Sequence, residues 1–353
     1  MKILMAAPNV SEGRDLDVVC EIAEAIKRGA GARADVKFLG AVPGAAQICT
    51  GEGVASLCVD AYTAQTSAGA GVGAGVGTGA GEGARADVKF LGAFPDADHN
   101  RTVFSYIGDP EAVLEATKRL AEAAFRLVDM TTQKGVHPRI GALDVVPFIP
   151  IKNVTTVEAV EISRQFGEWV GSKGIPVYYY EDSATNPNRV NLPDVRRGQY
   201  EGLEARLADP EWTPDEGPAQ FVPKTGAVLT CARAPLIAFN VNLRTNDVSI
   251  AKNIARAVRH ISGGYRYVRA IGLALETKGI SQVSMNLINY KKTPLPRVLE
   301  TIRSEAARYG VSIAGTELIG LMPTEAIEEI MRFYVQCHDF TSDQLIELNC
   351  LPE

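Results

Sequence analysis

A thirteen-residue segment that occurs twice limits which parts of this chain can build a fold. Residues 31–43 read GARADVKFLGAVP and residues 83–95 read GARADVKFLGAFP, so the copies match at 12 of 13 positions. Two copies do not make a solenoid, because about three or more repeats are needed to bury a continuous core. The second copy runs directly into a polar loop at residues 96–101, so we predict that it forms a sheet strand and that the first copy belongs to an appended loop.

The segment between the copies is predicted to be a flexible insertion. Glycine occupies every odd-numbered position from Gly69 to Gly83. Glycine loses the most entropy on folding and gives no side chain to a core, so residues 31–82 are set aside as an insertion. Whether this insertion is a tandem duplication or an error in the sequence stays open. A phosphate-binding loop is not indicated, because no Gly-Lys-Ser/Thr follows the glycines.

Apolar periodicity in the rest of the chain predicts the order βαββαβ twice. Expected strands are residues 2–7, 88–94, 102–107 and 140–149 in the first half and 236–241, 267–275, 280–288 and 311–318 in the second, with helices at 16–26, 110–127, 248–261 and 294–309. Asp109 and Pro110 are typical of a helix start, as is the capping box from Thr155 to Glu158. The pattern predicts an α/β (α+β) fold of two ferredoxin-like subdomains, residues 1–232 and 233–353, facing each other across a cleft.

Composition narrows the classes of function. The chain has 46% hydrophobic residues and a net charge of −6, which excludes wholesale disorder and argues against a nucleic-acid partner. The six cysteines form no CxxC pair and no HExxH motif occurs, so no metal site is predicted. The apolar stretch before Pro8 is too short for a signal peptide or a membrane span, so we expect a cytoplasmic protein without a membrane partner.

Two loop histidines are the candidates for chemistry. His137 lies between Gly135 and Pro138, just before an apolar strand, where a stiffened backbone would hold it at the end of a sheet. An imidazole both accepts and donates a proton near neutral pH, and the neighbouring Arg139 guanidinium suits a carboxylate. The alternative is a structural histidine that only hydrogen-bonds the backbone.

The second polar loop holds Asp96, Asp98, His99, Asn100 and Arg101. It is either a polar turn that closes onto the next strand or a group that recognises an amine and orients an imidazole. The functional interpretation gains weight if this loop meets His137 in space. The other two histidines, His260 and His338, are expected to be surface or capping residues.

Several motifs together resemble the glutamate formimidoyltransferase (formiminotransferase) family. They are PNVSEG at 8–13, NRTV at 100–103, KGVHPRIGALDVVPFIP at 134–150, GPAQFVP at 217–223, FNVNL at 239–243, QVSMNL at 282–287 and LIGLMP at 318–323. The resemblance covers nearly the whole chain apart from the insertion, and the 134–150 run is its most specific part.

The resemblance implies two ferredoxin-like subdomains with a substrate tunnel, in a homodimer. The implied reaction moves the formimino group of N-formimino-L-glutamate to N5 of tetrahydrofolate, giving L-glutamate, in histidine degradation and one-carbon metabolism. Tetrahydrofolate is the co-substrate and no metal is implied. Because bifunctional members continue into a cyclodeaminase domain and this chain ends at Glu353, a monofunctional transferase is expected.

The resemblance also implies roles for single residues. His137 matches the catalytic histidine of the family. The acidic residue that the family carries at the end of the 91–95 strand is missing, so its role is assigned to Asp96 or Asp98. Expected substrate-binding residues are Asn9, Asn100, Arg101 and Arg139, and expected folate-binding residues are Gly217, Phe221, Lys224 and Gly226.

Other functions remain open from the sequence. A glutamate formyltransferase, or a transferase that uses 5-formyltetrahydrofolate, needs almost the same pocket. A non-catalytic ligand-binding module is possible as well, because paired ferredoxin-like domains also serve as sensors. In a third alternative, the insertion disables an otherwise recognisable enzyme.

Overall fold

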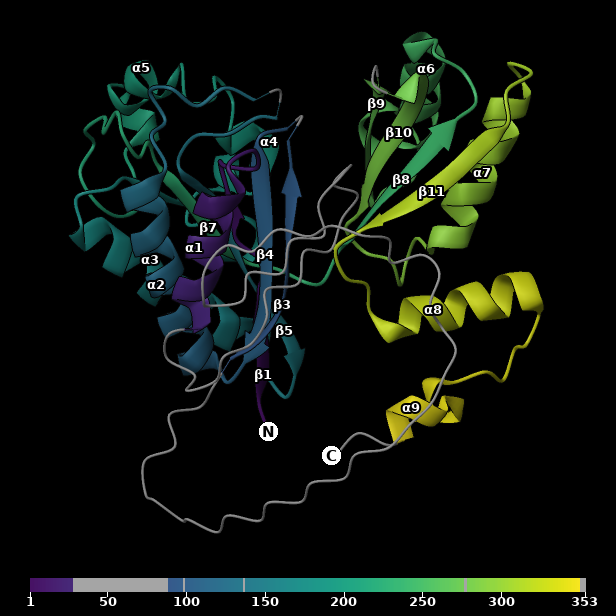
Figure 1. Cartoon of the computed structure of the whole chain (residues 1–353), viewed down its shortest axis with the longest axis horizontal. Helices are drawn as coiled ribbons and strands as arrows, with labels where there is room; N and C mark the ends of the chain where they lie inside the picture. The colour runs from purple at the N-terminus through teal and green to yellow at the C-terminus, as the bar shows by residue number, and fades with distance from the viewer. Residues whose placement is uncertain (28–87, 98, 136, 276–277, 350–353) are drawn as a thin grey trace. The chain divides into compact units, whose positions relative to one another are not determined.

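The computed structural model describes residues 1–27, 88–97, 99–135, 137–275 and 278–349, and contacts within it divide the chain into two units (Figure 1). Unit 1 is Met1–Arg233 and unit 2 is Ala234–Glu353. The first copy of the repeat and the rest of the 31–82 insertion lie outside the described residues, as does Asp98.

Unit 1 contains the first predicted βαββαβ motif. Its four main strands are β1 (Ile3–Ala6), β3 (Lys89–Asp96), β4 (Arg101–Gly108) and β5 (Leu143–Lys152), and its first two helices are α1 (Leu16–Lys27) and α2 (Pro110–Leu127). The strands pair in the order β5-β1-β4-β3, and all three pairings are antiparallel. This is the strand order of a ferredoxin-like sheet. The second copy of the repeat forms β3, as predicted.

The helices of unit 1 begin where the sequence places their caps. The Asp109 carboxylate accepts a hydrogen bond from the backbone N–H of Glu111, at 3.1 Å, and Pro110 occupies the first helical position of α2. Helix α3 (Thr156–Ser172) has the predicted capping box, in which Thr155 and Glu158 satisfy each other's backbone N–H groups. These free N–H groups have no partner inside the helix, so the caps define where the helices start.

Three strands extend this sheet beyond the predicted motif. They are β2 (Asn9–Val10), β6 (Val177–Tyr179) and β7 (Val228–Ala232). Strand β7 was not predicted; it pairs in parallel with both β5 and β6 and is buried along its whole length. Strand β5 begins at Leu143 rather than at the predicted Ile140, because the chain before it forms only an isolated bridge, at Gly141.

Unit 2 repeats the topology with a separate core. Its strands are β8 (Ile237–Leu243), β9 (Val268–Leu275), β10 (Ile280–Leu287) and β11 (Ile313–Ile319), and its main helices are α6 (Val248–Val258) and α7 (Leu295–Ala307). The order β11-β8-β10-β9 is again ferredoxin-like and antiparallel. The two predicted ferredoxin-like subdomains are therefore confirmed. Helix α6 ends earlier than the predicted residue 261, because His260–Ser262 forms a 3₁₀ turn.

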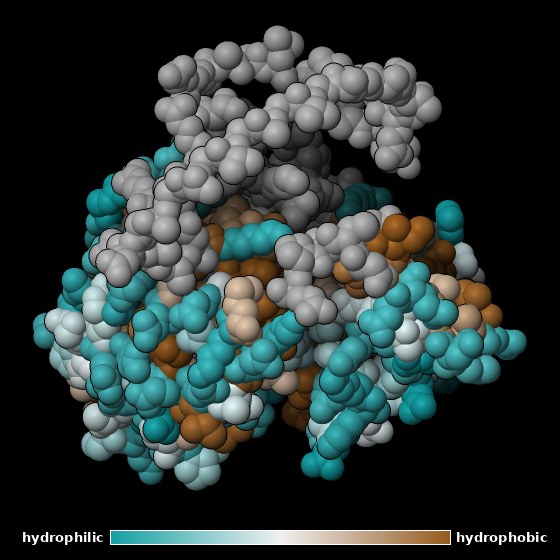
Figure 2. Space-filling view, turned by 90° about the horizontal axis from the view of Figure 1, so that it is seen from below, coloured by the Kyte–Doolittle hydropathy of each residue, from teal (hydrophilic) through white to brown (hydrophobic). Residues whose placement is uncertain are grey.

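The remaining helices are short, and they include α4 (Leu192–Val195), α5 (Leu203–Leu207), α8 (Thr324–Ile330) and α9 (Ile346–Asn349). Hydrophilic side chains cover most of the coloured face in Figure 2, with apolar ones scattered among them. Within the described residues, no helix combines the length and the apolar character that crossing a bilayer requires.

Candidate active site

The candidate site lies within unit 1, where three connecting segments meet beside strand β5. A small hollow is lined by Asn9, Val10, Ser11, His99, Asn100, Arg101, Gln133, His137, Arg139 and Asp144. These residues come from β2 and the loop after it, from the β3–β4 turn and the first residue of β4, from the loop between α2 and β5, and from β5 itself. Polar side chains from three parts of the sequence therefore share one small volume.

Asn100 connects the loop after β2 and the loop between α2 and β5 to the β3–β4 turn through side-chain hydrogen bonds. Its backbone has φ +48°, a left-handed conformation that asparagine tolerates better than most residues. The side-chain Oδ1 accepts a hydrogen bond from Gly13 N at 3.0 Å, and Nδ2 donates to the Lys134 carbonyl at 3.0 Å. The backbone carbonyl of Asn100 accepts a third hydrogen bond, from Gln133 Nε2. This sequence-predicted residue is nearly fully buried and positions the loops.

Two glycines allow the loops to approach the turn so closely. A Cβ atom added at Gly13 would lie 2.5 Å from the Arg101 carbonyl oxygen, and one at Gly135 would lie 2.3 Å from the His99 carbonyl oxygen. Real Cβ atoms do not come so near to backbone oxygens. Glycine is therefore required at both positions for the turn and the loops to pack together.

His137 is held with both ring nitrogens engaged. Nδ1 lies 2.7 Å from the Pro138 carbonyl oxygen, and Nε2 lies 2.8 Å from Arg101 Nη1. A guanidinium only donates, so Nε2 accepts and Nδ1 carries the proton. Burial, followed by the positive charges of Arg101 and Arg196, lowers the pKa of His137 to about 2. The ring is a neutral imidazole whose Nε2 lone pair is covered by Arg101.

Arg101 differs from its neighbours in how it is paired. Within the part of the chain that the structure describes, its hydrogen-bond partner is His137. Burial and the nearby Arg196 charge lower the pKa of Arg101 to about 10, which leaves it charged at neutral pH. A cation that lines the hollow and contacts a neutral ring has N–H groups to offer an anion.

Arg139, by contrast, is already occupied. Its Nη1 and Nη2 donate to the two carboxylate oxygens of Glu201 at 2.9 and 2.7 Å, and its Nε donates to Gln133 Oε1 at 2.8 Å. The hydrogen bond from Arg139 is the main reason that the pKa of Glu201 lies below its ordinary value. Arg139, predicted to bind a substrate carboxylate, does line the hollow, but its two Nη groups already bind the Glu201 carboxylate.

An ion pair between Asp144 and Arg196 was not singled out from the sequence. Asp144 lies in β5, where its Oδ1 accepts a hydrogen bond from Ile140 N at 2.9 Å and its Oδ2 contacts Arg196 Nη2. Both side chains are almost completely buried, and Arg196 Nε has no hydrogen-bond partner. A carboxylate inside an otherwise apolar strand was the signal for Asp144. Arg196 follows the short helix α4, far along the chain, and gave no such signal.

The polar loop does meet His137 in space. His99 Nδ1 lies 2.6 Å from Asp96 Oδ2, and the His99 backbone N–H donates to Asp96 Oδ1 at 2.9 Å. Burial of Asp96 opposes its ionisation, but the hydrogen bonds from His99 outweigh it, so the pKa of Asp96 lies below its ordinary value. The rings of His99 and His137 pack edge to face with centroids 5.8 Å apart. The condition set for a functional interpretation of this loop is met.

The match to known families decides what kind of protein this is. A model described as "Formiminotransferase domain, N-terminal subdomain" matches residues 80–233, and one described as "Formiminotransferase domain" matches residues 238–349. The chain belongs to the formiminotransferase family.

Three relatives show how far the similarity extends. The chain is 48% identical to glutamate formimidoyltransferase of Streptococcus pyogenes serotype M1 over 254 residues. These residues cover 72% of this chain and 85% of that protein. It is 40% identical over 263 residues to the enzyme of the same name from Thermoplasma acidophilum, with 74% and 86% coverage. Its identity to the formimidoyltransferase-cyclodeaminase of Gallus gallus is 42% over 246 residues, which span 68% of this chain and 46% of that relative.

The four residues expected to bind folate lie outside the lining of the hollow in this formiminotransferase. Gly217 and Gly226 have φ +77° and +66°, and a Cβ at either would collide with a backbone carbonyl oxygen. Phe221 packs against Tyr200, with ring centroids 5.5 Å apart. Lys224 Nζ donates to the Arg126 carbonyl at 2.9 Å. Each residue has a local structural contact.

Asn9 lies in β2 and lines the hollow, where its Nδ2 donates to the Ala7 carbonyl at 3.2 Å. Among the residues that the structure describes, no group of three or more histidine, cysteine, aspartate or glutamate side chains is placed to hold a metal ion.

Proposed function

We propose that this chain transfers the formimino group from N-formimino-L-glutamate to N5 of tetrahydrofolate, with His137 as the residue that moves the proton. The observation that carries the proposal is the neutral, oriented His137 ring beside the charged Arg101 in a polar hollow. The names of the two most similar relatives described above, both glutamate formimidoyltransferases, support the choice of reaction.

The chemistry needs one proton to move between two nitrogens. A bond forms between N5 and the amidine carbon, and the bond from that carbon to the glutamate nitrogen breaks. N5 loses a proton and the departing glutamate nitrogen gains one, so a base and an acid are required. In the simplest form of the proposal, the His137 imidazole takes the proton from N5 and returns it to the glutamate nitrogen.

Arg101 has to release His137 before this can happen, because it covers the Nε2 lone pair. A substrate carboxylate is a better partner for a guanidinium than a neutral ring, since charge-assisted bidentate hydrogen bonds are stronger. We propose that a carboxylate of the donor draws Arg101 away from His137. Substrate binding and exposure of the base would then be the same event.

Positioning of the substrates provides much of the remaining rate. Holding the amidine carbon against N5 removes the entropy cost of their encounter. Asp96 belongs to the proposal as the carboxylate that assists the histidines, whereas Asp98 lies outside the described residues.

The family resemblance supports the other parts of the proposal. These are a role in histidine degradation and one-carbon metabolism, a cytoplasmic homodimer, and binding of folate by the segment that holds Gly217, Phe221, Lys224 and Gly226. Tetrahydrofolate acts in the proposal as a co-substrate rather than as a resident cofactor.

The proposal is tested by assaying the full chain with formiminoglutamate and tetrahydrofolate and detecting L-glutamate and 5-formiminotetrahydrofolate. We expect stoichiometric formation of both products. Formylglutamate is the matched competitor, because it differs at one heteroatom. Faster turnover of the formyl compound would replace the proposed donor, and no transfer from either donor would reject a transferase.

A further inference from the structure

We propose that His99, supported by Asp96, is a second proton-transfer residue of this site and acts as the general acid that protonates the departing glutamate nitrogen. This inference rests on the proposed function and divides between two histidines the work that one imidazole would otherwise do. His137 then acts only as the base toward N5.

The first argument is the way His99 is held. Its Nδ1 faces Asp96 Oδ2 at 2.6 Å, so Nδ1 carries a proton and Nε2 is the other reactive nitrogen. Asp96 also accepts the backbone N–H of His99, which fixes the carboxylate to the residue that it orients. A histidine oriented by an aspartate through one nitrogen leaves the second nitrogen to exchange protons with a substrate. His99 lines the same hollow as His137.

The second argument is the contrast between the two rings. Guanidinium groups, Arg101 in contact and Arg196 nearby, oppose a positive charge on His137. An anionic carboxylate contacts His99, so the ion pair needed by a protonated His99 is already built. When the surroundings of two titratable groups favour opposite protonation states, the groups suit opposite roles. His137 starts as the base and His99 starts as the acid.

Charged side chains from several segments lie near His99. Asp96 belongs to β3, Arg101 to β4 and His137 to the loop before β5. Arg14, in the loop after β2, reaches the same turn, where its Nε donates to the Ala97 carbonyl at 2.9 Å. Asp144 and Arg139 complete the lining, and each is paired with a charged partner of its own, Arg196 and Glu201. Among the described residues, Asp96 is the carboxylate that contacts His99 directly.

The protons balance over one turnover. His137 accepts the N5 proton as N5 bonds to the amidine carbon. His99 gives its proton to the glutamate nitrogen as the carbon–nitrogen bond breaks. The products leave with His137 protonated and His99 neutral, and exchange with water restores the starting state. No redox partner or further reactant is needed.

The experiment compares two donors that differ in whether the leaving group needs a proton. One donor is formiminoglutamate, and the other is the S-formimidoyl derivative of 2-mercaptoglutarate, whose thiolate departs without protonation. In His99→Gln we expect kcat with formiminoglutamate to fall by about 10²–10³ and kcat with the thiol-based donor to fall by less than about threefold. In His137→Gln we expect a large loss with both donors. His260→Gln, in unit 2, is the matched control.

A second variant separates catalysis from structure. Asp96→Asn should show the same donor dependence as His99→Gln, with a smaller loss. If the Asp96–His99 pair only supported the turn, either variant would lose activity equally with both donors.

Each failure has a distinct meaning. An equal loss with both donors, or no loss in His99→Gln, would overturn the role of His99 while leaving the proposed function intact. A wild-type chain that transfers nothing from either donor would reject the proposed function itself. Because the thiol-based donor keeps both carboxylates, a binding defect would show as a raised KM for both donors rather than as a difference in kcat.

Discussion

The two units share one topology and differ in what they bury. Both contain a βαββαβ motif with the same strand order, each over a core of its own. Among the described residues, the buried charged side chains all lie in unit 1, and they are Arg139, Asp144 and Arg189. Burying a charge is costly unless it is paired. The same fold therefore carries a charged site in one unit and not in the other, which shows that fold alone does not fix chemistry.

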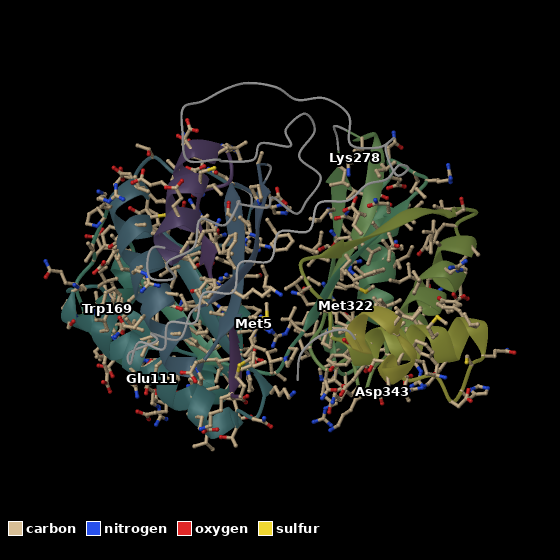
Figure 3. The ribbon with its side chains drawn as sticks, turned by 60° about the horizontal axis from the view of Figure 1, so that its bottom comes forward. Met5, Glu111, Trp169, Lys278, Met322 and Asp343 are labelled. Atoms are coloured by element: carbon tan, nitrogen blue, oxygen red, sulfur yellow. The ribbon has the colours of Figure 1, made fainter. Side chains whose placement is uncertain are left out.

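Unit 2 has a polar network of a different kind, formed by buried and partly exposed side chains. Glu317 accepts hydrogen bonds from Asn242, Gln282 and Lys278, at 3.0, 3.1 and 3.1 Å. Lys278, which is labelled in Figure 3, lies just before β10. These contacts join three strands, so this network stabilises the sheet. In unit 1, Arg101 instead contacts a neutral ring, which leaves its N–H groups able to bind an anion.

The largest expected effect is that of His137→Gln. This change removes the proposed base from unit 1 and should lower kcat by about 10²–10⁴ while folate binding survives. The measurement is turnover of formiminoglutamate, together with a folate titration of the variant. His260→Gln in unit 2 should change kcat by less than about twofold. If the two substitutions had equal effects, the assignment of chemistry to unit 1 would be wrong.

A matched pair of core substitutions tests whether the units are stabilised separately. Ile22 and Ile254 are both fully buried, one in each core, and Ile→Ala should cost about 2–5 kcal/mol of unfolding free energy in its own unit. Both tryptophans, Trp169 and Trp212, lie in unit 1, so their fluorescence in urea reports on that unit. Ile22→Ala should lower the fluorescence midpoint.

Ile254→Ala should leave the fluorescence midpoint unchanged and lower the midpoint of the circular dichroism transition. Equal fluorescence shifts in the two variants would mean that the units unfold as one cooperative body despite their separate cores.

The smallest expected effect concerns the cation that contacts His137. Arg101→Gln removes the charge proposed to bind the donor carboxylate and should raise KM for formiminoglutamate about 10–100-fold, because a charge-assisted hydrogen bond contributes about 1.5–3 kcal/mol. Arg256→Gln, on α6 of unit 2, is the control and should leave KM unchanged. A normal KM in Arg101→Gln would place the carboxylate elsewhere in the site.

The sequence predicted those parts of the fold that depend on local signals. Caps at Asp109 and Thr155 fixed the starts of α2 and α3, because a helix start depends on residues only two or three positions apart. Strand β7 was missed. A parallel strand buried on both faces shows no alternation, and β7 follows a long irregular connection. The two-residue strand β2 depends on its neighbours in the sheet rather than on its own pattern.

The sequence predicted only those residues of the site that stand out through their immediate neighbours in the chain. His137 and Arg101 stood out through their surroundings in two loops. His137 contacts Arg101, and Asp144 contacts Arg196, although the partners are far apart in the chain. The spacing of residues in the sequence therefore could not predict either contact. The sequence also did not reveal that the Arg139 guanidinium is already paired with the Glu201 carboxylate. Pairing of charges is a property of the folded chain, and it decides which cations remain for a ligand.

The bonds of Asn100 have a consequence for any attempt to redesign the donor specificity. One amide joins the loop at Gly13 to the loop at Lys134, and the same residue's carbonyl holds Gln133. Widening one wall of the pocket for a bulkier donor would therefore shift the opposite wall as well. Laboratory evolution toward new donors should progress through side chains that project from these loops, and insertions or deletions within them should be eliminated early.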